Sequence, residues 1–387
     1  MKTLNQYLIT ESAEEDKLKH LEHAEDHVIN AGKEGFKHAF NTLHGVHTAL
    51  TKNKSEVSLS HKFDGSPSIV FGHNPENGKF FVASKSAFNA NPKLNYSAAD
   101  IEKNHGHAPG LVNKLKAALK HLPKVTPKSG VYQGDVMHTP EDIKHKDHKI
   151  EFTPNTISYS VDKNSTEGKK VLGSKIGVAV HTAYKGNSMN DLKAEYNPNL
   201  SHFEHNPDVH VLHATMPAHK VEYDEKHQQK FQKHMQKAIE LNNKIKDYSH
   251  LEDHKIPLKT YINKTVRSGS APSVQGYKEH LRDQALSAAS KVKTEVAKQR
   301  KLADALIMVK HINDNKQSFN DTLKVHNELQ KAKDTLVSTL SSHKGDYEHH
   351  IAGKPTQPEG FVAVHKNRPT KLVNRAEFSR ANFEKNK

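Results

Sequence analysis

The sequence contains no cysteine, and no apolar run in it approaches the roughly 20 residues that a membrane-spanning helix needs. The lack of cysteine excludes disulfides and thiolate metal sites. The opening segment, MKTLNQYLITESAEED, lacks the long apolar core of a secretory signal peptide. Hydrophobic residues make up only 34% of the 387 residues, so we expect much of the chain to be solvated helix or loop, with no membrane as partner.

The chain has more positively than negatively charged side chains. Lysine and arginine number 58 against 44 aspartate and glutamate, which gives a formal net charge of +14. Such a balance favours a polyanionic partner, because basic surfaces bind phosphate backbones without regard to sequence. The 31 histidines are scattered, and without partners at set spacing they are expected to be exposed surface groups and not metal ligands.

Hydrophobic periodicity divides the chain into segments of different type. Apolar residues recur every three or four positions over 13–50 and 110–122, which predicts amphipathic helices. From about residue 56 apolar residues recur at every second position, which predicts short strands. NPENGK is typical of a hairpin turn between two of them. Further strands are predicted over 129–138, 155–161 and 175–184.

The later part of the chain is predicted to be helical over 223–343, before a breaker at 351–360 and two final short strands. These last strands are expected to return to the first sheet, which makes the helical block an insertion. The predicted organisation is a peptide and helical segment over 1–52, a domain formed by 53–215 and 351–387, and a helical insertion over 216–350.

One lysine stands at the mouth of a predicted strand, in HKFDGSPSIVFG. Taken alone, Lys62 would more often be a solvated edge lysine. Four further segments follow it in order and place polar or charged residues at strand ends. They are ASKSAF with Lys85, YQGDVM with Asp135, IGVAVHTAY with His181 and Tyr184, and PEGFVAVH with Glu359 and Val362, followed by TKLVNRAEFS with Lys371 and Arg375.

This ordered set resembles the covalent nucleotidyltransferase superfamily, which comprises ATP-dependent DNA and RNA ligases and mRNA capping enzymes. The similarity is greatest to phage RNA ligases, in which the final motif is also followed by a Phe-Ser pair, here Phe378–Ser379. It implies an α+β fold with an antiparallel-sheet nucleotidyltransferase core (ATP-grasp-like), an N-terminal helix and a large helical insertion. No C-terminal OB domain fits after the last motif.

The resemblance implies a role for each residue. Lys62 would form a covalent lysyl-AMP intermediate with ATP, and a lysine amine attacks phosphorus only in its neutral form. Asp64 and Gly65 in the turn are also implied to contact the nucleotide, and Lys85 would contact phosphate or ribose. Asp135 and Glu359 would bind the ribose and Mg²⁺, and Lys371 and Arg375 would lie near the phosphates. Val362 would pack against one face of the adenine, with His181 or Tyr184 against the other. Mg²⁺ is expected because carboxylate and phosphate oxygens are hard ligands.

The sequence departs from the family pattern at several places. Ser66 and Pro67 follow the Lys-x-Asp-Gly motif where the family has a basic residue, and Asp135 stands where glutamate is usual. The expected function is an ATP-dependent polynucleotide ligase that seals 5′-phosphate to 3′-hydroxyl ends, with RNA favoured over DNA. Two alternatives stay open: a nucleotidyltransferase that does not ligate, and a non-enzymatic DNA-binding phage internal head protein.

The N-terminus resembles the capsid-targeting peptides of phage internal head proteins. MKTLNQYLITES begins with Met-Lys-Thr and carries the triplet Ile9-Thr10-Glu11, which fits the cleavage pattern of such peptides. The expected location is the host cytoplasm, and this resemblance adds packaging in the virion.

Overall fold

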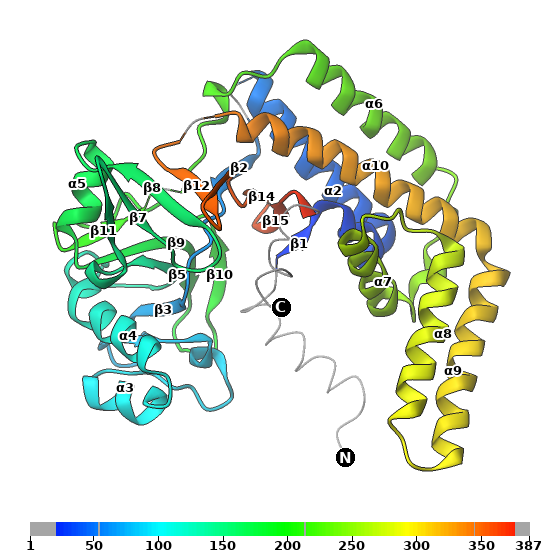
Figure 1. The fold of residues 1–387 in the computed structure, drawn as a ribbon, viewed down its shortest axis with the longest axis horizontal. Coiled ribbons are helices and arrows are strands. Elements are labelled where there is room, and N and C mark those ends of the chain that lie inside the picture. The colour runs from blue at the N-terminus through cyan, green and yellow to red at the C-terminus, as the bar shows by residue number, and fades with distance from the viewer. Residues whose placement is uncertain (1–20, 53–54, 213, 344, 376–387) are drawn as a thin grey trace. The chain divides into compact units, whose positions relative to one another are not determined.

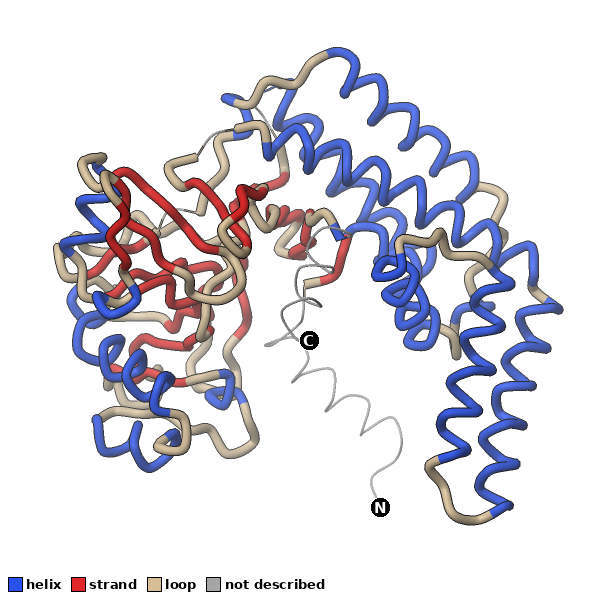
Figure 2. The backbone as a smooth tube through the Cα atoms, in the orientation of Figure 1, coloured by secondary structure: helices blue, strands red, loops and turns tan. Residues whose placement is uncertain are grey.

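The computed structural model describes residues 21–52, 55–212, 214–343 and 345–375. The chain is an α+β protein whose sheets are mainly antiparallel (Figures 1 and 2). It divides into two compact units. Among the described residues, the first contains Leu21, Ser58–Pro217 and 345–369, and the second contains Glu22–Val57, Ala218–His343 and 370–375. The N-terminal targeting resemblance lies outside the described residues.

The first unit is built on a central sheet with strand order β10-β9-β5-β3-β4, and β11 pairs with β9 in parallel. All other pairs in this sheet are antiparallel. The strands are β3 (Ser68–His73), β4 (Phe80–Ala83), β5 (Val131–His138), β9 (Ile176–Lys185), β10 (Lys193–Tyr196) and β11 (Val209–Val211).

Both faces of the central sheet are covered, so its strands are nearly continuous apolar runs and not alternating ones. On one face, Ile69 and Phe71 pack in a core with α3 (Ala98–His105) and α4 (Pro109–His121). On the other face, Val70 packs in a second core with Tyr184. This second face also carries the candidate site.

A second antiparallel sheet in the same unit has the order β13-β12-β8-β7-β6. Its strands are β6 (Lys144–Lys146), β7 (Lys149–Phe152), β8 (Ser158–Asp162), β12 (Glu348–Ile351) and β13 (Lys354–Thr356). The unit also contains α5 (Thr166–Gly173) and the pair formed by β2 (Val57–His61) and β14 (Phe361–His365). Strands from both ends of the chain therefore meet in one unit.

The second unit is mostly helical. Its helices are α2 (His27–Lys52), α6 (Glu225–Asn242), α7 (Lys255–Ser268), α8 (Val274–Ser290), α9 (Glu295–Asp314) and α10 (Lys316–Ser341). α10 packs against α6 and α2, and α8 packs against α9 (Figure 1). The short strand β1 (Glu22–His23) pairs in parallel with the end of β15 (Arg368–Leu372). The N-terminal helix therefore joins the helical block in one unit, whereas the sequence predicted a separate segment.

Charged side chains are buried at the centre of the helical unit. Lys333 of α10 and Glu25 are both fully buried and form an ion pair of 2.8 Å. Arg375 donates to Asp26 over 2.9 Å, and His326 lies 2.9 Å from the same carboxylate. Burial alone would raise the pKa of Glu25, but the charge of Lys333 lowers it to about 2. Each buried charge therefore depends on a partner of opposite sign.

None of the described helices combines the length and the apolar character needed to cross a lipid bilayer.

Replacing Lys333 tests the buried network. Lys333→Ala removes the ammonium that pairs with Glu25 at 2.8 Å and leaves Arg375 at 3.5 Å as the other described cation beside it. The free energy of unfolding is expected to fall by about 3 kcal/mol, because the buried carboxylate loses its closer partner. Chemical denaturation measures this change. Lys324→Ala, at a half-exposed position on the same helix, is the control and should cost less than about 0.5 kcal/mol. Equal effects of the two variants would contradict the account.

Candidate active site

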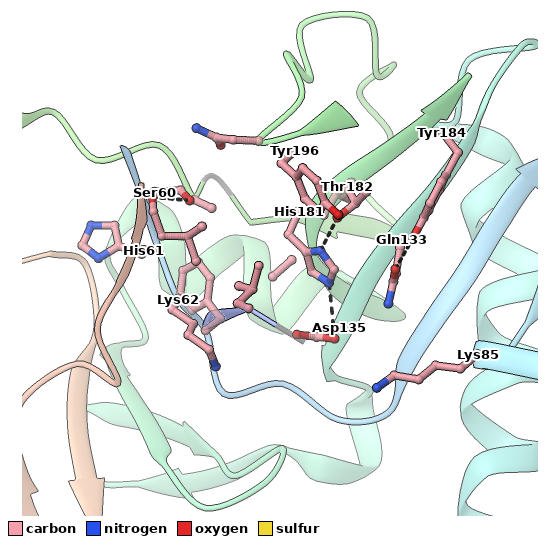
Figure 3. A pocket seen from close by; sticks show the side chains of 17 residues that line it. Ser60, His61, Lys62, Lys85, Gln133, Asp135, His181, Thr182, Tyr184 and Tyr196 are labelled. Carbon is pink, nitrogen blue, oxygen red and sulfur yellow. Dashed lines mark hydrogen bonds and ion pairs between the residues drawn. The ribbon is translucent and has the colours of Figure 1, made fainter. Parts of the chain in front are cut away.

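A pocket lies on the face of the central sheet that carries Val70 and Tyr184. It is formed entirely within the first unit (Figure 3). Its lining residues are Leu21, Ser60–Phe63, Lys85, Gln133, Asp135, Ala179–Thr182, Tyr184, Tyr196, Asn197, Ala214 and Val362. Segments that are far apart in the sequence therefore meet here, and they include five of the motifs predicted to act together.

Strand β5 contributes two polar side chains to the pocket. Gln133 and Asp135 are two residues apart, so strand alternation places both on the same face of the sheet. Between them, Gly134 faces the carbonyl of Ala179, and a Cβ there would lie 2.7 Å from that oxygen. Glycine thus lets β5 and β9 approach closely beside the pocket.

Strand β9 contains a bulge at His181. In the register with β5, Gln133 lies opposite Thr182, whereas Gly134 lies opposite Val180, so His181 is the extra residue. A bulge re-aims side chains beside a site. Before it, Ala179 faces the pocket, and after it, Thr182 and Tyr184 do, so residues of both parities line the same cavity.

Lys62 is held by residues from the opposite end of the chain. Its backbone N–H donates to the carbonyl of Gly360 over 2.9 Å, and its ammonium group donates to Glu359 Oε1 over 2.5 Å. Both side chains keep partial access to solvent, with 28% and 18% of their surface exposed. The lysine is therefore an accessible, positioned amine with a carboxylate as its hydrogen-bond partner.

Glu359 has a raised pKa and one carboxylate oxygen without a hydrogen-bond partner among the described residues. Burial raises the pKa of Glu359 above its ordinary value; nearby Asp64 and Asp135 also raise it, while Lys62 opposes the change. Its second oxygen, Oε2, is buried and has no hydrogen-bond partner among the described residues. A buried carboxylate oxygen without a partner is costly, so it marks a position that a ligand or ion can satisfy.

Asp64 does not line the pocket. Its carboxylate accepts from the side chain of Asn155 and from the backbone N–H groups of Thr156 and Ile157, each within 2.9 Å. Its own backbone N–H donates to the hydroxyl of Tyr159. In the structure the side chain anchors the turn that presents Lys62, and its contact with the nucleotide stays a prediction.

Gly65 brings the same turn against β5. A Cβ at this position would lie 2.4 Å from the Cβ of Asp135 and 2.8 Å from the sulfur of Met137. The next residue, Ser66, donates its backbone N–H to the carbonyl of Val136 over 3.0 Å. Gly65 therefore acts through close packing that sets the position of the turn relative to Asp135.

Asp135 is the best-connected acid in the pocket. Burial alone would raise its pKa, but the neighbouring His181, the hydroxyl of Ser68 and the charge of Lys62 lower the pKa below its usual value. Nε2 of His181 lies 3.7 Å from Oδ1 of Asp135 (Figure 3). Asp135 is thus an anion under working conditions.

A chain of hydrogen bonds leads to Asp135 from the core. The buried hydroxyl of Tyr184 donates to Gln133 Oε1 over 2.6 Å, and Gln133 Nε2 donates to the hydroxyl of Ser68 over 3.0 Å. Because the tyrosine fixes which end of the Gln133 amide is the acceptor, the amide donors are aimed toward Ser68 and the pocket. Tyr184 is therefore an orienting residue at 2% exposure.

The predicted residues divide between the two units. Lys62, Lys85, Asp135, His181 and Val362 line the pocket, and Figure 3 shows the Lys85 ammonium pointing toward Asp135. Lys371 belongs to the helical unit, where it lies opposite His23 in the β1–β15 pair, and its phosphate contact stays a prediction.

Arg375 lies in the helical unit and is almost fully buried. Only 5% of its side chain is exposed, and its guanidinium is committed to Asp26, Glu25 and Asn263 inside the helical unit. These contacts satisfy the buried guanidinium, and the predicted phosphate contact of Arg375 stays a prediction.

Several pocket residues were missed in the sequence. Gln133 could have been found, because strand alternation pairs it with Asp135. Thr182, Tyr196 and Asn197 carry no comparable signal, since the bulge in β9 and the pairing of β9 with the end of β10 place them there.

No group of three or more histidine, aspartate or glutamate side chains converges into a metal site within the described part of the chain. Mg²⁺ is commonly bound through only one or two carboxylates plus substrate phosphates. Asp135 and the unpartnered oxygen of Glu359 fit that pattern.

Gly65→Ala is expected to lower the free energy of unfolding by about 1–3 kcal/mol, because its methyl group would collide with Asp135 and Met137. Denaturant titration measures the change. Gly110→Ala, at a helical position with nothing within 4 Å of the added Cβ, is the control and should be neutral or stabilising by up to about 1 kcal/mol. A neutral Gly65→Ala variant would show that the turn is not packed as described.

Comparison with known proteins gives one result. No curated protein and no solved structure matches the chain. The profile of a family described as "Family of unknown function (DUF6267)" matches residues 16–387, which is most of the sequence. The chain therefore belongs to the DUF6267 family.

Proposed function

We propose that this protein is an ATP-dependent polynucleotide ligase that carries AMP covalently on Lys62. The observation that supports this proposal is the meeting of Lys62, Lys85, Asp135 and Val362 in one pocket, with the Lys62 ammonium on the carboxylate of Glu359. A positioned amine, a proton acceptor, a second cation and an apolar surface are the groups that nucleotidyl transfer to lysine requires.

In the first step, Nζ of Lys62 forms a bond to the α-phosphorus of ATP. The bond from that phosphorus to the bridging oxygen of the β-phosphate breaks, and pyrophosphate leaves. The amine must first lose a proton, and Glu359 Oε1 is its hydrogen-bond partner. Because burial raises the pKa of Glu359, this carboxylate holds a proton more readily than an exposed glutamate does.

The other pocket residues bind and orient the nucleotide. Lys85 neutralises phosphate charge and Val362 packs against the adenine, while His181 lines the same pocket beside Asp135. A Mg²⁺ ion held by Asp135 and Glu359 would supply charge neutralisation for the pyrophosphate leaving group.

Two further transfers complete sealing. An oxygen of a polynucleotide 5′-phosphate attacks the lysyl-AMP phosphorus; the P–N bond breaks and the Lys62 nitrogen regains a proton. The 3′-hydroxyl then attacks the activated 5′-phosphorus, AMP leaves, and the hydroxyl proton passes to solvent. The net charge of +14 favours a polyanionic acceptor for AMP.

Self-labelling tests the first step. After incubation with Mg²⁺ and ATP labelled at the α-phosphate, the denatured wild-type protein should retain the label. Lys62→Arg should lose it, because a guanidinium keeps its charge and is no nucleophile. Lys79→Arg, at an exposed lysine of the β3–β4 hairpin, is the control and should label normally. Absence of label on the wild type would overturn the proposal, and labelling without sealing of 5′-phosphorylated RNA would restrict it to AMP transfer.

Glu359→Gln tests the proton acceptor. The amide keeps the shape of the side chain but cannot take the lysine proton, so the rate of self-labelling should fall by about 10²- to 10⁴-fold. Single-turnover labelling measures this rate as a function of pH. A larger deficit at low pH than at high pH is expected, because hydroxide replaces the missing base. An unchanged rate and pH profile would remove Glu359 from the mechanism.

A further inference from the structure

Half of the net positive charge of the protein lies in three helices of the second unit. Over 255–314, from the start of α7 to the end of α9, the sequence has twelve lysine and arginine residues against five aspartate and glutamate residues. The chain as a whole carries +14. A concentration of this kind costs self-repulsion, so it calls for a partner of opposite charge.

The charge is most accessible at the tip of the α8–α9 hairpin. Lys291 and Lys293 lie in the turn between the helices, and Arg300 and Lys301 lie in the first turns of α9; all four are exposed. None of the four forms an ion pair with a described residue. These cations therefore face solvent without an internal counter-charge.

α9 itself is exposed around most of its circumference. Only Val309 and Ile312 are buried among its described residues, whereas Val296 and Ile307 are 80% and 68% exposed. Val296, Arg300 and Ile307 follow helical spacing and share one face. Apolar and cationic side chains are therefore mixed on this helix and not separated onto opposite faces.

We propose that the tip of the α8–α9 hairpin, defined by Lys291, Lys293, Arg300 and Lys301, binds the phosphate backbone of a nucleic acid. The proposal rests on the proposed function for the statement that this nucleic acid is the substrate. Lysine and arginine on an open surface contact phosphates without reading bases, so the hairpin supplies affinity and not sequence specificity.

The mixture of cationic and apolar side chains on α9 argues against a membrane as its partner, and the like charge of the tip argues against a second copy of this chain. A helix that lies on a membrane needs an apolar face segregated from its cationic face, which α9 lacks. A second copy of the same basic tip would meet like charge. A polyphosphate backbone matches the four cations directly.

Binding without ATP tests the proposal on the full-length protein. The affinity for a fluorescent single-stranded RNA is measured over a range of salt concentrations. Changing Lys291, Lys293, Arg300 and Lys301 to glutamate should weaken binding and reduce the slope of log affinity against log salt by ~3, since each lost phosphate contact with a single strand contributes about 0.7. Self-labelling with ATP should be unchanged.

A matched control separates position from total charge. Changing Lys226, Lys230, Lys233 and Lys237, all exposed on α6, to glutamate alters the net charge equally and should leave most of the affinity and the slope in place. If the acidic tip variant unfolds by circular dichroism, glutamine at the same four positions should give the same loss of slope.

Three results would overturn the proposal. They are an equal loss of RNA binding from the α6 and tip variants, RNA binding that the tip variants leave unchanged, and a tip that binds phosphatidylserine vesicles in preference to RNA. The tip proposal is tested by RNA binding without ATP, and the ligase proposal by labelling of the wild-type protein with ATP, so their failures give different patterns.

Discussion

The contact between Lys62 and Glu359 joins two segments that lie 297 residues apart in the sequence, and the candidate site depends on it. A backbone hydrogen bond from the N–H of Lys62 to the carbonyl of Gly360 holds the same two segments together. A lysine at this depth needs a partner, and a glutamate whose pKa burial has raised needs a donor. The pair therefore stabilises the closed arrangement of the two segments, and it also places an amine beside a group able to accept its proton.

The rest of the site follows from how the central sheet is built. The turn after Lys62 is anchored on one side by Asp64 and packed on the other by Gly65, so the lysine backbone has little freedom. The bulge at His181 and the closely packed Gly134 then bring the polar side chains of β5 and β9 to one face. Hydrogen bonds from the buried Tyr184 hydroxyl through Gln133 to Ser68 orient polar groups beside Asp135, whose pKa lies below its usual value.

Much of this organisation could be predicted from local pattern. The change of period near residue 56 marks the first sheet, and the predicted strands over 129–138 and 175–184 correspond to β5 and β9. The helical insertion predicted over 216–350 compares with Ala218–His343 in the structure. The bulge at His181 depends on how two strands pair, and the partners of Asp64 lie more than 90 residues away, so neither has a local signal. The ion pair of Arg375 with the buried Asp26 also has no local signal, because the two residues are 349 positions apart in the sequence.

The central claim is that Lys62 is a nucleophile and not only the cationic half of an ion pair. The most direct measurement is tandem mass spectrometry of the protein after reaction with ATP and Mg²⁺, under conditions that preserve a phosphoramidate bond. The account predicts one AMP per chain, located on the ε-nitrogen of Lys62, and its release when pyrophosphate is added back. AMP on another residue, or a Lys62 peptide that stays unmodified, would contradict it.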